Sequence, residues 1–198
     1  MGRIHCIIGK SASGKDTLFS SILSKNKGEI VPVVPYTTRP KRVHETDGVD
    51  YFFVSEKEME DMDKLGQIVE SRSYHTVHGT WHYFTRTFQM EENKNYLLIT
   101  TLEGAISLQR HYGSDLVSVV YLFLDDKARL LRSIERESRQ CSPNYSEVCR
   151  RFLADQNDFS DEKLGFIQNI YPINTDDGLE ETMAQWEVYF ANERKNLL

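Results

Sequence analysis

Apolar residues are concentrated in five continuous runs, and the segments between these runs carry helical patterns. The runs are rich in Val, Ile and Leu and cover residues 4–8, 30–34, 96–101, 116–124 and 166–173. Runs without polar alternation are typical of strands buried on both faces, and intervening helices cover both faces of such a sheet. The pattern therefore predicts an α/β fold with a parallel sheet of about five strands.

A different pattern interrupts this alternation between residue 36 and about residue 90. It contains an aromatic run at 51–54, followed by Ser55 and Glu58, which form a capping box for a helix that ends near Gly66. Further strand-like pieces follow. We interpret this region as a small lobe inserted between the second and third core strands, able to close over a substrate.

A glycine-rich segment directly follows the first apolar run and precedes a helical run. Its residues are Gly9, Lys10, Ser11, Ala12, Ser13, Gly14 and Lys15. Such a turn points several backbone N–H groups into one concavity at the positive end of the helix dipole, where its lysine reaches terminal phosphates. The segment predicts a phosphate-binding loop and a three-layer P-loop NTPase fold. A connecting turn with an incidental lysine is the simpler alternative.

The residues after Lys15 depart from the usual motif, which has Ser or Thr there to hold magnesium. Here Asp16 follows the lysine, and Thr17 comes next. A carboxylate is a competent Mg²⁺ ligand, directly or through water, but it also places negative charge beside phosphates. Asp16 and Thr17 are therefore the expected Mg²⁺ ligands.

Three cations, Arg39, Lys41 and Arg42, stand within four positions just after the second core strand. In open α/β sheets, ligands bind at loops that follow the carboxyl ends of strands. The two arginines could form forked bonds to a phosphate. A solvated loop whose charges pair with Glu45 or Asp47 is the alternative.

A second basic segment contains six arginines between positions 129 and 151. Arg132 and Arg136 lie four residues apart and share a helix face, and a break at 142–144 precedes the next helix. Phosphoryl transfer needs mobile cations over the bridging and terminal phosphates. The alternative is a pair of charged helices joined by ion pairs to nearby glutamates.

The run Thr37-Thr38-Arg39-Pro40-Lys41-Arg42, followed after eight residues by Tyr51-Phe52-Phe53-Val54, resembles the nucleoside-monophosphate segment of guanylate kinases. The phosphate-binding loop precedes it at the family's distance, and the similarity covers nearly the whole chain. The resemblance implies phosphorylation of GMP by ATP, with Mg²⁺ as the metal.

The resemblance also implies roles for residues of the acceptor lobe. Glu70 matches the family's glutamate that recognises guanine. A carboxylate suits guanine because it accepts hydrogen bonds from both N1–H and the 2-amino group, a pair of donors that adenine does not offer. A surface glutamate on a strand is the alternative. The residues implied in binding the acceptor are Arg39, Arg42, Tyr51, Glu70, Tyr83, Thr85 and Thr101.

On the donor side, the resemblance implies that Lys15 and the lid arginines Arg132, Arg136 and Arg151 act on the ATP phosphates. Residues Gly9 to Thr17 would bind ATP, and Asn174 resembles the family's asparagine near the adenine. The run Asn174-Thr175-Asp176 is also an ordinary helix N-cap.

Three features depart from the family's pattern. Pro35 stands where a serine near the guanine is common, and Thr101 stands where the family has an acidic residue. The stretch from Glu70 to Tyr83 is longer than usual and contains His75, His78, Trp81 and His82. His78 and His82 would bind zinc together only on a helix, whereas the pattern there is strand and turn. We expect them to line the acceptor pocket or a solvated turn.

Two other functions stay open at this point. Ribose bisphosphate phosphokinases resemble this chain in having Gly-Lys-Asp in the phosphate-binding loop, so the acceptor could be another small phosphorylated molecule. Guanylate-kinase-like domains that only bind partner proteins are the second alternative. Such domains typically lose the phosphate-loop and lid residues that are present here, including Gly9, Gly14, Lys15, Arg136 and Arg151.

The net charge of −6 argues against a general nucleic-acid or membrane surface, because such surfaces need excess Lys and Arg. We see no signal peptide or membrane span, and expect a cytoplasmic protein. Cys6, Cys141 and Cys149 lack the spacing of a disulfide framework or zinc site. We expect nucleotides as partners, and a monomer or homodimer.

The expected organisation is one guanylate kinase-like domain over residues 1–198. Its parts are a core of 1–35, 91–128 and 164–198, a nucleoside-monophosphate lobe of 36–90, and a lid region of about 137–150.

Overall fold

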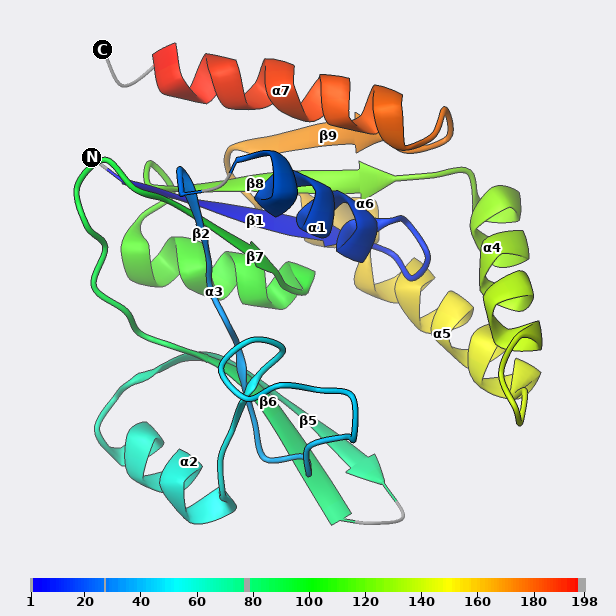
Figure 1. The fold of residues 1–198 in the computed structure, drawn as a ribbon, viewed down its shortest axis with the longest axis horizontal. Helices are drawn as coiled ribbons and strands as arrows, with labels where there is room; N and C mark the ends of the chain where they lie inside the picture. Colours follow the sequence, from blue (N-terminus) through cyan, green and yellow to red (C-terminus); the bar gives the residue numbers. More distant parts are fainter. Residues whose placement is uncertain (1, 27, 77–78, 196–198) are drawn as a thin grey trace.

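The computed structural model describes residues 2–26, 28–76 and 79–195, and its centre is a five-stranded parallel sheet (Figure 1). The strand order is β2-β7-β1-β8-β9. The strands are β1 Arg3–Gly9, β2 Ile30–Pro32, β7 Asn95–Ile99, β8 Val117–Phe123 and β9 Ile170–Asn174. All four pairings in this sheet are parallel, which confirms the expected α/β architecture.

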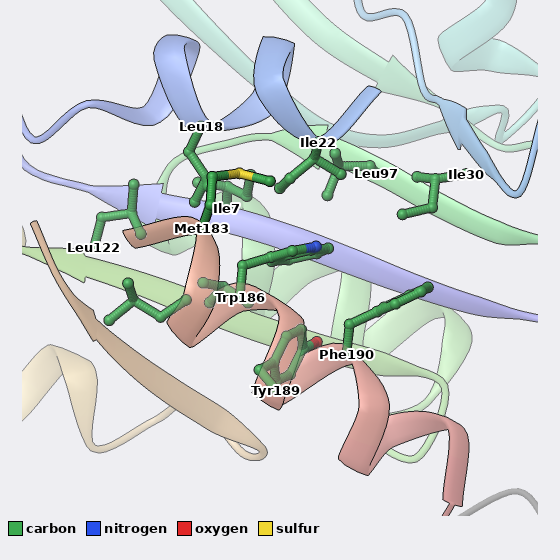
Figure 2. Packing of buried hydrophobic residues seen from close by; sticks show 12 residues of the cluster. Ile7, Leu18, Ile22, Ile30, Leu97, Leu122, Met183, Trp186, Tyr189 and Phe190 are labelled. Carbon is green, nitrogen blue, oxygen red and sulfur yellow. The ribbon is translucent and has the colours of Figure 1, made fainter. Parts of the chain in front are cut away.

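Helices cover both faces of this sheet because successive side chains of each strand point to opposite faces. On one face, Ile7 packs with α1 (Lys15–Lys25) and α7 (Leu179–Lys195), around the buried Trp186 (Figure 2). On the other face, Cys6 and Ile8 pack with α3 (Leu102–Tyr112). The strands are therefore buried on both sides, as their continuous apolar runs predict.

The last strand begins later than the sequence predicts. The apolar run was expected to form a strand over 166–173, whereas β9 covers Ile170–Asn174. A short helix, α6 (Asp161–Leu164), precedes it, and the backbone N–H groups of Phe166 and Ile167 donate to carbonyls of this helix. These two apolar residues therefore close the end of α6 before the chain enters the sheet.

A second, four-stranded sheet lies wholly between residues 36 and 86, with strand order β4-β3-β6-β5. Its elements are β3 Tyr36–Thr37, β4 Phe52–Phe53, α2 Glu56–Lys64, β5 Ile68–Thr76 and β6 Gly79–Arg86. The capping box of Ser55 and Glu58 is confirmed at the start of α2. The chain leaves the core after β2 and returns to it in β7.

Two helices lie beyond the carboxyl ends of β1 and β8, next to the loop that joins β1 to α1 (Figure 1). They are α4 (Asp126–Ser138) and α5 (Tyr145–Asp158), and the expected break separates them. Asp125 caps α4 and Asn144 caps α5. Among the residues that the structure describes, no helix is long and apolar enough to cross a membrane.

Candidate phosphotransfer site

The loop between β1 and α1 is folded around its own lysine. Lys15 Nζ donates to the carbonyls of Gly9 at 2.7 Å and Lys10 at 3.0 Å. Gly14, at φ 91°, is the N-cap of α1 in a conformation that a side chain disfavours. Burial lowers the pKa of Lys15, and the neighbouring carboxylate of Asp16 opposes this shift. The loop thus holds a cation at the amino end of a helix, where anions bind.

A carboxylate from α5 contacts this loop. Asp155 Oδ2 accepts from the backbone N–H of Ser11 at 2.8 Å and from Arg129 Nη1 at 2.8 Å. The Arg129 side chain is 1% exposed, pairs also with Asp126, and lies 4.2 Å over the ring of Phe152. One amide of the phosphate-binding loop is therefore already bonded to a protein anion, whose charge a buried arginine balances.

The lid helices and the loop enclose a small cavity lined by Ser11, Arg136, Glu147 and Arg151, among others. Arg151 Nε donates to Glu147 at 2.7 Å. Bonds from Arg150 and Arg151 lower the pKa of Glu147 to about 2. Two of the three expected lid arginines thus line one cavity with the loop, and the ion-paired helices considered as the alternative are also present.

Arg132 lies outside this cavity lining. Its Nη2 donates to the backbone carbonyl of Thr175 at 3.1 Å. The neighbouring Asn174 ends β9, and its side chain accepts from the backbone N–H of Asp176 at 2.9 Å. Because α7 begins only at Leu179, the N-cap alternative for Asn174 is wrong. Arg132 instead joins the lid to the loop that contains Asn174.

In the inserted lobe, Arg39 is 4% exposed and forms a forked pair with Glu45, at 2.7 and 3.0 Å. Its Nε donates to the hydroxyl of Tyr83 at 3.0 Å, and its guanidinium lies 5.6 Å from the ring centre of Tyr51. The bonds from Arg39 lower the pKa of Glu45 to about 2. Arg42 is exposed, and its backbone N–H donates to Glu45.

The structure brings three of the expected acceptor residues together at Arg39. Pairing with Glu45, the alternative considered for this segment, is present in the same cluster.

Glu70 lies on β5 and is 7% exposed, so the surface alternative for this residue is wrong. Its Oε1 accepts from the hydroxyl of Thr85 at 2.7 Å, directly across the β5–β6 pair. Thr101 lies at the start of α3, where its hydroxyl accepts from the backbone N–H of Gly104. Thr101 is thus a helix cap.

The lobe histidines form local contacts within the β5–β6 hairpin. His82 Nδ1 lies 2.9 Å from the Ser73 hydroxyl, and His75 Nδ1 lies 3.0 Å from that of Thr80. His78 lies outside the described residues. In the described part of the chain, no group of three or more His, Cys, Asp or Glu side chains is placed to hold a metal.

Sequence reasoning missed Asp155, which contacts the loop, and Arg72, which forms an ion pair with Glu70 at 3.4 Å. Asp155 follows Arg151 by four positions on a helix, and Arg72 follows Glu70 by two positions on a strand. Each therefore shares a face with a residue that was identified. This spacing was the available signal.

Comparison with known proteins gives one family throughout. A family model described as guanylate kinase matches residues 1–164. The guanylate kinase of Thermotoga maritima is 33% identical over 193 residues, which are 97% of this chain and 76% of that protein. That of Mycoplasma genitalium is 29% identical over 142 residues, 69% of this chain and 57% of that protein.

A solved structure gives the same picture for the fold. The crystal structure of guanylate kinase from Anaplasma phagocytophilum matches with a TM-score of 0.65 and 18% identity, covering 97% of this chain and 86% of that one. The family model covers most of this chain, and the Thermotoga maritima relative matches almost all of it. The chain belongs to the guanylate kinase family.

Proposed function

We propose that this protein transfers the terminal phosphoryl group of ATP to GMP. The observation that carries the proposal is the placement of Glu70 and the Arg39–Tyr83 cluster on one sheet. Thr85, which bonds Glu70, and Tyr83, which bonds Arg39, lie two positions apart on β6. That separation is about 7 Å along a strand. A buried carboxylate for a base and an arginine–tyrosine cluster for a phosphate suit the two ends of a nucleoside monophosphate.

In this proposal, Arg39, Arg42, Tyr51 and Tyr83 hold the acceptor phosphate, and Glu70 accepts from N1–H and the 2-amino group of guanine. The phosphate displaces Glu45 from Arg39 as it binds. Arginine suits this exchange because its planar fork binds carboxylate and phosphate in the same way.

On the donor side, the P-loop residues and Lys15 hold the ATP phosphates, with Asn174 near the adenine. An oxygen of the acceptor phosphate attacks the terminal phosphorus of ATP. The bond between that phosphorus and the oxygen that bridges it to the rest of ATP breaks, and ADP leaves. Arg136 and Arg151 stabilise the charge on the transferred group, and Arg132 supports the lid. Closure of the lid and lobe excludes water, which would otherwise hydrolyse ATP.

Asp16 and Thr17 fit a magnesium ion by their chemistry. Both side chains carry oxygen ligands and lie exposed in the first turn of α1, next to Lys15. Mg²⁺ prefers one or two protein oxygens, together with water and phosphate oxygens. When bound, it would neutralise charge on the donor phosphates.

The test is ADP release from magnesium-ATP across a panel of acceptors, with a Lys15→Ala variant as the blank. The panel contains GMP, dGMP, IMP, AMP, CMP, UMP, ribose bisphosphate and no acceptor. We expect fast turnover with GMP and little with AMP. Turnover only with ribose bisphosphate would favour the alternative of a kinase with another small phosphorylated acceptor. ATP binding without any turnover would favour an inactive binding domain. Family membership favours neither of these alternatives.

A further inference from the structure

Arg72 lies beside Glu70 in the acceptor lobe. The two residues are two positions apart on β5 and face Tyr83 and Thr85 across the strand pair. Side chains at such positions share one face of a sheet. Arg72 therefore lies on the face that bears the proposed base-binding and phosphate-binding groups, next to Glu70 along its own strand and opposite Tyr83 on β6.

Hydrogen-bonding capacity is left unused at this point. Arg72 Nε lies 3.4 Å from Glu70 Oε2, which is an ion pair but longer than a hydrogen bond. Both atoms are buried and lack a hydrogen-bond partner in the described residues, although the two side chains are 27% and 4% exposed. Their charges compensate each other, while an acceptor oxygen and a donor N–H remain available.

Buried polar atoms without a hydrogen-bond partner are few in the described part of the chain, and most of them lie close to Glu70. Five buried side-chain atoms lack a partner there, and three of them belong to Glu70, Arg72 and Thr100. A fourth is the Ser13 hydroxyl of the phosphate-binding loop. Buried polar groups are normally bonded, so each exception calls for an explanation. The simplest explanation for these atoms is a ligand that supplies the missing hydrogen-bond partners.

The close packing of α3 beside Glu70 depends on Gly104. A Cβ atom at position 104 would lie 3.4 Å from Glu70 Oε2 and 2.1 Å from Thr100 Oγ1. The absence of a side chain at position 104 therefore lets α3 pack closely against both unpartnered atoms, which are buried. The cluster is thus polar, buried and closed on the side of α3, so a ligand would reach it from the face of the inserted sheet.

We infer that Arg72 is a specificity-determining residue, which donates to the O6 and N7 edge of the guanine whose N1–H and 2-amino group bind Glu70. This inference rests on the proposed function. Guanine presents two donors followed by two acceptors along its edge, and arginine binding to O6 and N7 is the commonest specific contact with guanine. A carboxylate next to a guanidinium is the complement of that order. Adenine presents an acceptor, a donor and an acceptor, and does not match it.

The experiment measures kcat/KM with saturating magnesium-ATP for GMP, IMP, 7-deaza-GMP and 6-thio-GMP. IMP lacks the 2-amino donor, whereas the last two remove N7 or weaken the acceptor at position 6. For Arg72→Met we expect a loss of about 10- to 100-fold with GMP, mainly in KM. The loss should be much smaller with 7-deaza-GMP and 6-thio-GMP, because part of the contact is already missing.

Two further variants separate specificity from charge balance and from general damage. Arg72→Lys keeps the positive charge beside Glu70 but lacks the planar fork, so it should resemble Arg72→Met toward the analogues. Arg86→Met removes another lobe arginine, next to Thr85 and on the opposite face of β6, and should leave the ratios between analogues unchanged. Thermal melting of each variant reports on folding.

Three outcomes would overturn the inference. They are an unchanged KM for GMP in Arg72→Met, full activity in Arg72→Lys, and an equal loss for GMP and its analogues, which would assign Arg72 to the acceptor phosphate. Absence of GMP turnover in the wild-type protein would instead overturn the proposed function.

Discussion

The phosphate-facing and base-facing parts of the proposed site differ in how their polar groups are satisfied. At the phosphate-facing end, Arg39 is bonded to Glu45, Arg151 to Glu147 and Arg129 to Asp155. At the base-facing end, Glu70 Oε2, Arg72 Nε and Thr100 Oγ1 lack hydrogen-bond partners among the described residues.

The difference fits the charge of the group that each end is proposed to bind. A phosphate carries enough negative charge to replace a carboxylate on an arginine, so these arginines can be paired until it arrives. A neutral base cannot displace an ion pair, because it offers only dipoles in exchange. Groups that read a base must therefore keep hydrogen-bonding atoms available, as Glu70 Oε2 and Arg72 Nε do although their side chains form an ion pair at 3.4 Å.

The largest effect should come from removing a phosphate-binding cation. We expect Lys15→Ala and Arg151→Ala each to lower kcat by about 10³-fold, because charge on the transferred group loses a partner. Arg151 is 54% exposed on its side chain, so its removal should leave the melting temperature nearly unchanged. Near-normal rates in either variant would contradict its assigned role.

A smaller effect is expected where the phosphate-facing pair is buried. Asp155→Ala leaves the buried Arg129 with Asp126 alone and should lower the free energy of unfolding by about 3 kcal/mol. Asp158→Ala on the same helix removes a solvent-exposed pair with Lys163 and should cost less than about 1 kcal/mol. Denaturant unfolding of the two variants measures the difference. Equal losses would mean that burial does not distinguish these pairs.

Adding a side chain to the closely packed base-facing end should weaken acceptor binding without unfolding the protein. We expect Gly104→Ala to raise KM for GMP by about 10-fold, equivalent to one lost hydrogen bond, because the added Cβ displaces the Thr100 hydroxyl. KM for ATP should not change. Ser107→Ala, one turn further along α3, is the control and should leave both constants unaltered. A shift in both KM values for Gly104→Ala would indicate general distortion.

The smallest effect should come from freeing a lid arginine. Glu147→Gln releases Arg151, and we expect KM for ATP to fall a few-fold, since exposed ion pairs contribute about 0.2 to 1 kcal/mol. Because the pKa of Glu147 is about 2, it stays ionised in any assay near neutral pH. Glu135→Gln breaks the exposed pair with Arg139 and should have no such effect. A rise in KM for Glu147→Gln would show that the glutamate supports the lid.

The core fold could be predicted from the sequence because its signals are local. Strands buried on both faces produce continuous apolar runs, and the loop at Gly9 to Lys15 has its strand before it and its helix after it. The predicted start of β9 at residue 166 was wrong, because Phe166 and Ile167 are apolar but belong to the turn after α6. Hydrophobicity alone does not separate a buried strand from a turn that closes a helix.

The partners of the site residues could not be predicted in the same way. Ser11 and Asp155 are 144 positions apart, and their contact exists only because the fold brings α5 to the loop. The contact between Gly104 and Glu70 likewise depends on how α3 lies against the inserted lobe. Sequence patterns identify residue types and faces, but not which distant faces meet.

The contact between Asp155 and Ser11 has a mechanical consequence for the lid. Asp155 and Arg151 lie one turn apart on α5, about 6 Å along its axis. Asp155 links the end of α5 to the phosphate-binding loop through the backbone N–H of Ser11, so a displacement of the loop would be transmitted along the helix to Arg151. Binding of phosphate in the loop and the position of the lid arginine would then be coupled through this one contact.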